Sequence, residues 1–405
     1  MPNLLILLLF ISWRTINSWV LYLAGKVIYY LGFFPYPREL FDFGRSQIIT
    51  ALANFDGIHY LLIARRGNYQ QWEQAYFPLY PLLIRVVNVV FQNELISALV
   101  ISNISFLIGL FVLMKYLKLI SNNNKYPSIS VLLFLLAFPT SFFFGAAYTE
   151  GLFFLLFILT LYFLKKDQYL PTGFLALLAA MTRLIGVFLV IPITLHLIQK
   201  VRFVTKNFRL NLKYILFSLF NPKYFSLVLS PVFGLGLYCL YLWKTTGDPL
   251  MFLTSQPLFG ANRSTDIILP PQVVWRYLKI FFTASHNFQY YVSAFEFISF
   301  SFVVAILVFD LAKQLRFNKG PKNNLKLTVI NNDRLALNLL SFANIVRPVL
   351  TGTLSSIPRY ALFSLSFFIH ISEIKSSSIK SVIFGIFLLF HVIILALFGQ
   401  GYFIS

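Results

Sequence analysis

Apolar runs of roughly 18 to 25 residues recur from one end of this chain to the other, long enough to cross about 30 Å of hydrocarbon as helices. Of the 405 residues, 58% are hydrophobic and only 11% are charged, whereas a soluble protein carries about a quarter charged residues. A membrane β-barrel would instead show short segments of alternating hydrophobicity. The sequence therefore predicts an all-α polytopic membrane protein with about nine spans.

The chain is strongly basic, with a net charge of +20 from 33 basic and 13 acidic residues. In a soluble protein this excess would suggest nucleic acid, but here the basic residues gather in loops between the apolar runs. The positive-inside rule and anionic lipid headgroups explain that pattern, so we expect no nucleic-acid partner. We expect the basic loops 200–223 and 313–334 to be cytoplasmic, the first as a helix on the membrane surface.

The basic loops also indicate on which side of the membrane the remaining loops lie. If they are cytoplasmic, counting spans places the catalytic-loop candidate 35–80 and the outer loop 244–290 on the opposite side of the membrane. The number of spans agrees with this placement only if residues 170–198 form a broken re-entrant hairpin with Arg183 at its tip. Irregular backbone within the membrane is tolerated where it lines a cavity. We therefore expect one membrane domain, residues 1–405, with a single outward-facing vestibule.

Asp56 stands out because it lies in a short helix-like run between two long apolar segments. In a helix, His59 and Tyr60 would share its face, and Gly57 would allow close approach of another segment. One interpretation is that Asp56 only caps the helix. The other is a functional carboxylate at the mouth of a membrane segment, where ionisable groups are costly and usually functional.

The other acidic residues divide into two groups. Most, including Glu73, lie in polar loops or at span ends and are expected to be solvated, while Asp310 closes a span beside basic residues as an anchor would. Glu150 differs because it precedes a purely apolar helix on the same predicted side as Asp56. Its simpler role would be that of a first-turn carboxylate favoured by the helix dipole.

Two arginines lie next to apolar runs and need an explanation. Arg183 could form an ion pair with Glu150, and Arg359 could extend to the lipid headgroups. Alternatively, both could bind a phosphate, for which the planar guanidinium is suited. No group of His and acidic residues has the spacing of metal ligands, and no nucleotide-binding glycine motif occurs. We therefore expect neither a metal nor a cofactor.

Four motifs occur in order along most of the chain. They are Phe55–Tyr60 with Phe77–Pro81, Pro139–Glu150, Thr182–Gly186 and Ile357–Tyr360. Together they resemble the PIG-V family, the GPI mannosyltransferase II type, although that family usually has Trp at the position of Phe55. The short chain and its basic loops suggest a prokaryotic member.

The resemblance implies a bundle of the type C glycosyltransferase kind. Such enzymes move a sugar, usually mannose, from a polyprenyl-phosphate donor to an acceptor hydroxyl, with inversion and on the extracytoplasmic face. The implied partners are the lipid-linked donor, a lipid or glycan acceptor and membrane lipids, while an accessory subunit is left open. The implied location is the plasma membrane of a prokaryote or the endoplasmic reticulum membrane of a eukaryote.

Asp56 is the expected catalytic residue, because an inverting transfer needs a base that takes the acceptor's proton. The leaving group is already a phosphate and needs neutralising, which Arg183 or Arg359 could do. The residues expected to bind substrate are His59, Tyr60, Glu150, Arg183, Arg359 and Tyr360. The alternative function is a secondary transporter of a small solute, which predicts inverted repeats and acidic residues within the spans.

Overall fold

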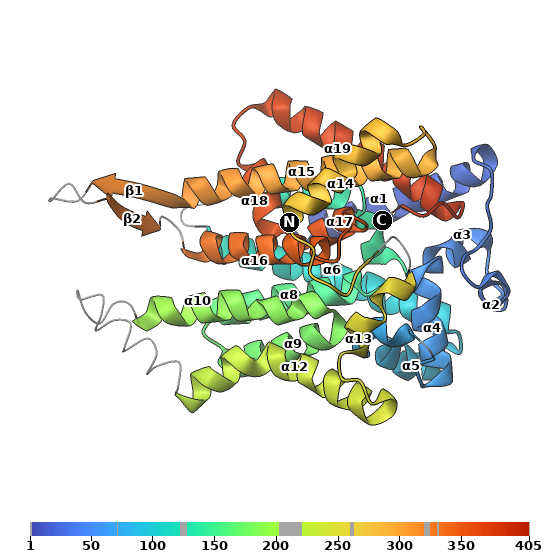
Figure 1. Ribbon diagram of the computed structural model, residues 1–405, viewed down its shortest axis with the longest axis horizontal. Helices are drawn as coiled ribbons and strands as arrows, with labels where there is room; N and C mark the ends of the chain where they lie inside the picture. Colours follow the sequence, from blue (N-terminus) through green and yellow to red (C-terminus); the bar gives the residue numbers. More distant parts are fainter. Residues whose placement is uncertain are drawn as a thin grey trace.

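The computed structural model describes residues 2–70, 72–121, 128–201, 221–259, 263–319, 325–329 and 332–404. Within these ranges the chain is helical apart from its connections and one short β-hairpin, as the predicted all-α class requires (Figure 1). The surface helix predicted for the basic loop 200–223 falls on residues 202–220, outside the described ranges.

Five of the described helices are long and apolar enough to cross a membrane. They are α1 (Pro2–Val27), α6 (Glu94–Ile120), α12 (Pro222–Thr246), α15 (Phe288–Gln314) and α19 (Ser377–Gly399). The predicted number of nine spans is not confirmed, because the other apolar runs form shorter helices. One of them, α8 (Glu150–Lys165), has 16 residues, or about 24 Å of helix, against about 30 Å of hydrocarbon.

The remaining elements are shorter or interrupted. The helices of intermediate length are α4 (Asp56–Arg66), α5 (Leu79–Phe91), α7 (Ser128–Ala137), α9 (Tyr169–Thr182), α10 (Val190–Val201), α14 (Pro270–Thr283), α16 (Asn332–Val349) and α18 (Leu365–Ser372). The short helices and 3-10 turns are α2 (Pro37–Phe41), α3 (Gln47–Thr50), η1 (Ala51–Ala53), η2 (Glu73–Ala75), η4 (Ser141–Gly145), η5 (Leu184–Leu189), α13 (Met251–Thr254), η6 (Gln256–Phe259) and α17 (Ile357–Ala361).

Helices α6, α8, α9 and α12 pack in that order, each against the next. Small residues make the contacts close, as is usual between membrane helices. A Cβ added at Gly151 of α8 would meet the backbone oxygens of Ser102 and Phe144, and one added at Gly234 of α12 would meet the carbonyl oxygen of Leu177 in α9. This row of helices places the first turn of α8, and with it Glu150, inside the protein.

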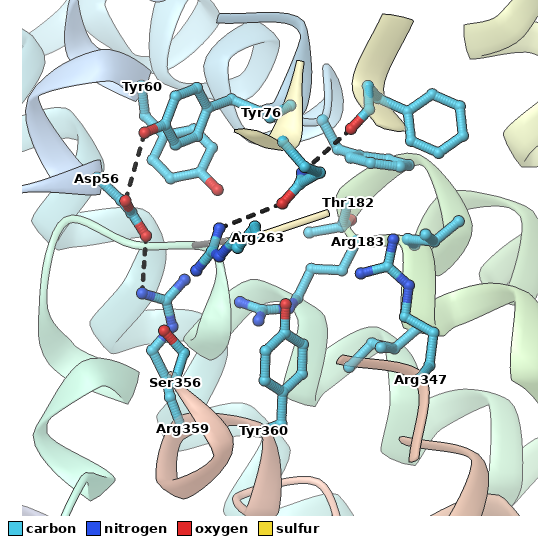
Figure 2. Close-up of a pocket in the computed structure, with 16 residues that line it drawn as sticks. Asp56, Tyr60, Tyr76, Thr182, Arg183, Arg263, Arg347, Ser356, Arg359 and Tyr360 are labelled. Atoms are coloured by element: carbon cyan, nitrogen blue, oxygen red, sulfur yellow. Dashed lines mark hydrogen bonds and ion pairs between the residues drawn. The ribbon is translucent and has the colours of Figure 1, made fainter. Parts of the chain in front are cut away.

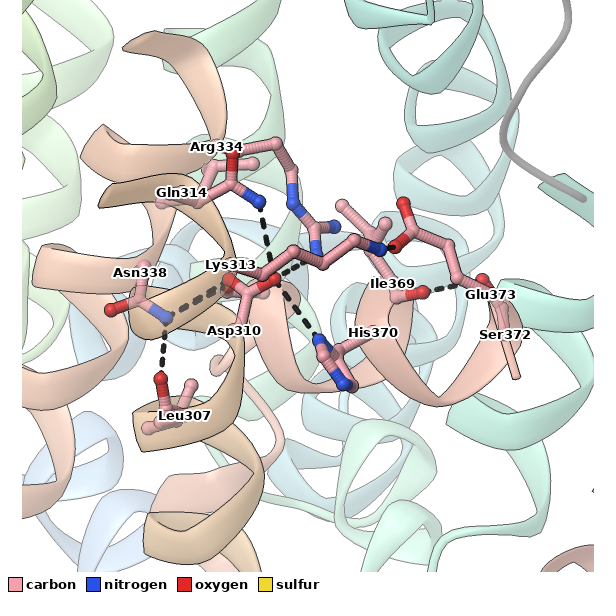
Figure 3. Close-up of polar contacts among 12 residues, drawn as sticks. Leu307, Asp310, Lys313, Gln314, Arg334, Asn338, Ile369, His370, Ser372 and Glu373 are labelled. Carbon is pink, nitrogen blue, oxygen red and sulfur yellow. Dashed lines mark hydrogen bonds and ion pairs between the residues drawn. The ribbon is translucent and has the colours of Figure 1, made fainter. Parts of the chain in front are cut away.

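Helices α15, α16 and α18 are tied together by a buried carboxylate, Asp310 (Figure 3). It accepts hydrogen bonds from Asn338 at 2.9 Å and from the Arg334 guanidinium and the Ser366 hydroxyl, and it lies 3.2 Å from Nδ1 of His370. Asp310 is 0% exposed. The predicted anchoring role at a span end is therefore wrong, because a buried charge must be paired within the bundle.

The basic segment 313–334, expected to be a loop, contains an antiparallel hairpin of β1 (Leu315–Lys319) and β2 (Leu325–Val329). Leu315 pairs with Val329 and Lys319 with Leu325. The two strand sequences carry β-favouring residues such as Phe317 and Val329 and flank a segment rich in Gly, Pro and Asn, which is a hairpin pattern. Strand β1 continues directly from α15.

The described elements that the two groups of loops connect lie at opposite ends of the molecule. Figure 1 shows the hairpin, the last turn of α10 and the first turn of α12 at one end of the long axis, and helices α2 to α5 at the other. The basic loops 200–223 and 313–334 therefore join elements at the same end, and the segment around Asp56 lies at the opposite one. This is the grouping that the charge pattern predicts.

Candidate active site

A polar cavity of about 110 Å³ gathers side chains from distant parts of the chain (Figure 2). It is formed by the start of α4, the segment before α5, the break between α9 and η5, α13, η6, the loop before α14, the end of α16 and α17. The residues that line it are Asp56, Tyr60, Ala75, Tyr76, Phe77, Thr182, Arg183, Leu184, Ile185, Phe252, Gln256, Arg263, Arg347, Ser356, Arg359 and Tyr360. Three of the four sequence motifs thus meet in one place.

Asp56 begins α4 and faces this cavity. Phe55 precedes it with φ 59° and ψ −116°, a backbone conformation that residues with a Cβ rarely adopt and that occurs at functional sites. The Phe55 ring packs against Phe34, Phe398 and Phe403, which hold it in place. The N-cap position of α4 is occupied by Phe55, and Asp56 is the first helical residue, so the interpretation of Asp56 as an N-cap is wrong.

Two side chains of the described residues form hydrogen bonds with the Asp56 carboxylate. Its Oδ2 accepts a hydrogen bond from Nη1 of Arg359 at 2.7 Å, and its Oδ1 accepts one from the Tyr76 hydroxyl at 3.3 Å. Burial alone would raise the pKa of this carboxyl, but the Arg359 guanidinium outweighs it and holds the pKa below its usual value. Asp56 is therefore ionised at neutral pH, and with 29% of its side chain exposed it can reach a ligand.

Glu150 lies behind the cavity at the start of α8 and is 0% exposed. Its Oε1 forms ion pairs with Nη1 of Arg183 and, at 2.8 Å, with Nε of Arg359. Thr149 accepts a further hydrogen bond from Arg183 at 2.9 Å. The predicted ion pair between Arg183 and Glu150 is confirmed. The predicted extension of Arg359 to lipid headgroups is wrong, because this side chain is only 9% exposed.

The close approach of α4 to the segment just before α8 depends on Gly57, as the sequence predicted. A Cβ at this position would come within 3.2 Å of the Tyr148 ring and 3.3 Å of the Ala147 carbonyl oxygen. Tyr148 in turn donates a hydrogen bond of 2.5 Å to the backbone oxygen of Asn54. These contacts join the Asp56 motif to the segment that carries Glu150.

The backbone turns sharply at Arg183. Helix α9 ends there with extended φ and ψ, and the 3-10 turn η5 leads directly into α10. A Cβ on Gly186 would lie 2.5 Å from the backbone of Ala179, so η5 folds back tightly on α9. This is the break that the sequence predicted, and it presents Arg183 and Thr182 to the cavity.

Two tyrosines predicted to bind substrate also line the cavity. The Tyr60 ring packs edge-on against Tyr76 and Tyr80, with centroids 5.0 and 5.3 Å away. The guanidinium of Arg183 lies 5.5 Å from the centroid of the Tyr360 ring, within the range of a cation–π contact. Both rings therefore line the same cavity as Asp56.

His59, in contrast, lies outside the lining of the cavity. Its Nδ1 is 3.4 Å from Oε1 of Glu73, and its ring stacks on Tyr76 at 4.8 Å. Glu73, expected to be solvated, is only 2% exposed and also accepts hydrogen bonds from Arg66 and from the Gln70 backbone. His59 therefore supports the tyrosine that bonds to Asp56, and it does not face a ligand in this cavity.

Sequence reasoning missed two further arginines of the cavity. Arg347, near the end of α16, contacts Tyr360, and Nη1 of Arg263 donates a hydrogen bond of 3.2 Å to Oε1 of Gln256. Arg347 interrupts an apolar run, which is a signal for function that could have been used. Arg263 lies in a polar loop, where one sequence offers no such signal.

The sequence of the chain matches the model of a known family. The model of the family described as Mannosyltransferase (PIG-V) matches residues 36–248, more than half of the chain. The match includes Asp56, Glu150 and Arg183, and no curated protein matches the chain. The chain therefore belongs to the PIG-V family of mannosyltransferases, as its motifs predicted, and is a membrane glycosyltransferase.

Proposed function

We propose that this protein transfers mannose from a polyprenyl-phosphate-mannose donor to a hydroxyl of a lipid-linked or glycan acceptor, with inversion at the anomeric carbon. The observation that carries the proposal is an ionised, partly exposed Asp56 in a cavity lined by four arginines. A base and a set of cations are what transfer from a phosphate leaving group needs.

The acceptor oxygen attacks the anomeric carbon from the side opposite the phosphate, and Asp56 takes the hydroxyl proton as the new bond forms. The bond between the anomeric carbon and the phosphate oxygen breaks, and its electron pair stays on the phosphate. Arg359 orients the Asp56 carboxylate through their 2.7 Å contact and keeps it ionised. Tyr60 and Tyr360 line the same cavity, and their rings border the space that the sugar occupies.

A second cavity supports a lipid-linked donor. It measures about 270 Å³ and has a mostly apolar lining. Residues that are neighbours in the sequence line the two cavities, since Phe77 and Thr182 line the polar one while Pro78 and Met181 line the apolar one, and this supports a connection between them. A polyprenyl chain in the apolar cavity would thus continue from a phosphate held in the polar one.

The charge pattern supports an extracytoplasmic reaction. The basic loops join elements at the end of the bundle away from Asp56, and such loops stay in the cytoplasm. The cavity would then face outward from one membrane domain comprising residues 1–405. In a prokaryote that membrane is the plasma membrane, and in a eukaryote it is the endoplasmic reticulum membrane.

The experiment is release of polyprenyl phosphate from radiolabelled polyprenyl-phosphate-mannose by the purified protein in lipid. We expect turnover, at least to water, that falls roughly 10² to 10⁴-fold in Asp56→Asn, the range typical of losing a general base. Asp42→Asn is the matched control, because Asp42 lies exposed in the same loop region. Equal rates for Asp56→Asn and wild type would refute the role of Asp56.

A further inference from the structure

The cavity holds more positive charge than its carboxylates balance. Four arginines line it, and two carboxylates lie in or behind it. Arg359 pairs with both Asp56 and Glu150, and Arg183 pairs with Glu150. These four groups neutralise one another. The unbalanced charge of plus two therefore belongs to the other two arginines.

The side chains that those two arginines, Arg263 and Arg347, contact directly are uncharged, and the carboxylates of Asp56 and Glu296 act on Arg263 only at longer range. Arg263 donates to the Gln256 side chain, and Arg347 contacts Tyr360. Throughout the described part of the chain, no carboxylate lies within ion-pair distance of either guanidinium. Both side chains are only half-buried and line the cavity (Figure 2). Such groups are poised to bind an anion that enters it.

We propose that Arg263 and Arg347 form the phosphate site for the leaving group, and that they bind polyprenyl phosphate in its dianionic form. The proposal rests on the transfer reaction proposed above. It assigns the phosphate contact to these two arginines, whereas Arg183 and Arg359 hold the carboxylates. The two arginines come from different parts of the chain, the loop before α14 and helix α16, so the phosphate would be clamped between them.

The charge of the leaving group explains why two free cations are needed. In the donor the phosphate is a diester with one negative charge. When the bond to the anomeric carbon breaks, the phosphate becomes a monoester with up to two charges, its second pKa being about 6. A site with a charge of plus two therefore binds the departing phosphate better than the donor. Only such differential binding accelerates the chemical step.

The binding experiment uses polyprenyl phosphate as the probe and polyprenol, which has no phosphate, as its counterpart. For the wild-type protein we expect polyprenyl phosphate to bind more tightly at pH 7.5 than at pH 5, because the second ionisation lies near pH 6. Arg347→Gln and Arg263→Gln should each weaken that binding roughly 10 to 100-fold at pH 7.5 and reduce its pH dependence, as expected when charge-assisted contacts are lost. Binding of polyprenol should not change, which also shows that the variants are folded.

Two further variants sharpen the comparison. Arg347→Lys keeps the charge but loses the planar fork, so it should recover part of the pH dependence. Arg65→Gln is the matched control, because Arg65 pairs with Glu94 on the surface and lies outside the cavity. Unchanged affinity and pH dependence in both Gln variants at Arg263 and Arg347 would overturn the proposal, whatever their turnover.

Kinetics distinguish the donor phosphate from a phosphate on the acceptor. Cleavage of the donor to water without any acceptor should lose kcat roughly 100-fold in Arg347→Gln, comparable to removing one oxyanion donor, with a smaller change in KM. A defect that appears only with acceptor would overturn the assignment to the leaving group. Binding of polyprenyl phosphate could depend on Arg263 and Arg347 while turnover does not depend on Asp56. That result would support the phosphate site and refute the proposed reaction.

Discussion

Glu150 provides the sharpest test of the electrostatic architecture. In one interpretation it is only a first-turn carboxylate of a helix, a role worth roughly 0.3 to 1 kcal/mol at a surface. In the structure it is fully buried and holds the guanidinium groups of Arg183 and Arg359. Replacing it with alanine would leave both cations without their shared counter-charge, since only Asp56 would remain to face Arg359.

The expected loss is large. Removing one partner of a buried ion pair costs about 3 to 5 kcal/mol, because the remaining charge is left uncompensated. Glu150→Ala should fall in this range. Glu150→Gln keeps the volume and one acceptor oxygen for Arg183, so its loss should be smaller, about 1.5 to 3 kcal/mol, the range of a hydrogen bond to a charged group.

Glu94 provides a matched control. It also starts a long apolar helix and also pairs with an arginine, Arg65, but that guanidinium is 39% exposed. Exposed pairs contribute about 0.2 to 1 kcal/mol, so Glu94→Ala should be nearly neutral. The assay is unfolding of the purified protein in detergent, followed by tryptophan fluorescence. If Glu150→Ala costs no more than Glu94→Ala, the buried-pair reasoning is refuted.

Two other perturbations test the site and the fold. Because Arg359 holds the pKa of Asp56 low, Arg359→Gln should raise the pKa of Asp56 and move the acid limb of the kcat/KM profile to higher pH. If the midpoint of that limb does not move, the electrostatic role of Arg359 is contradicted. Gly186→Ala should disturb the break at Arg183, since its Cβ would press on Ala179, and should destabilise the protein in the same unfolding assay. Gly236→Ala is the control for Gly186→Ala, because a Cβ at Gly236 meets nothing within 4 Å and alanine favours helix. Similar losses of stability in the two variants would argue against tight packing at the break.

Much of the site could be predicted from the motifs. Asp56, Tyr60, Arg183, Arg359 and Tyr360 were all expected to act together, and all five line one cavity. The motifs are short and local, so the residue types that chemistry requires can be recognised without knowing how they meet. What they bind stays a proposal.

The errors concern burial and pairing. Glu73 looks solvated in sequence because its neighbours are polar, yet it is buried against His59 and Arg66. Asp310 looks like an anchor beside lysines, yet it is the centre of a network across three helices. Both misinterpretations have one cause, since the environment of an acid depends on which segments fold over it.

Several properties of this protein follow from its sequence alone. Apolar runs, their interruption at Gly and Pro, and the placement of basic residues are local patterns, and they determine the helical membrane class, the break at Arg183 and the grouping of loops. Tertiary structure decided which charges are neutralised and which are free. Asp56 and Arg359 lie 303 positions apart and meet at 2.7 Å. Such a contact depends on the packing of whole helices, and this packing alone leaves Arg263 and Arg347 available for a ligand.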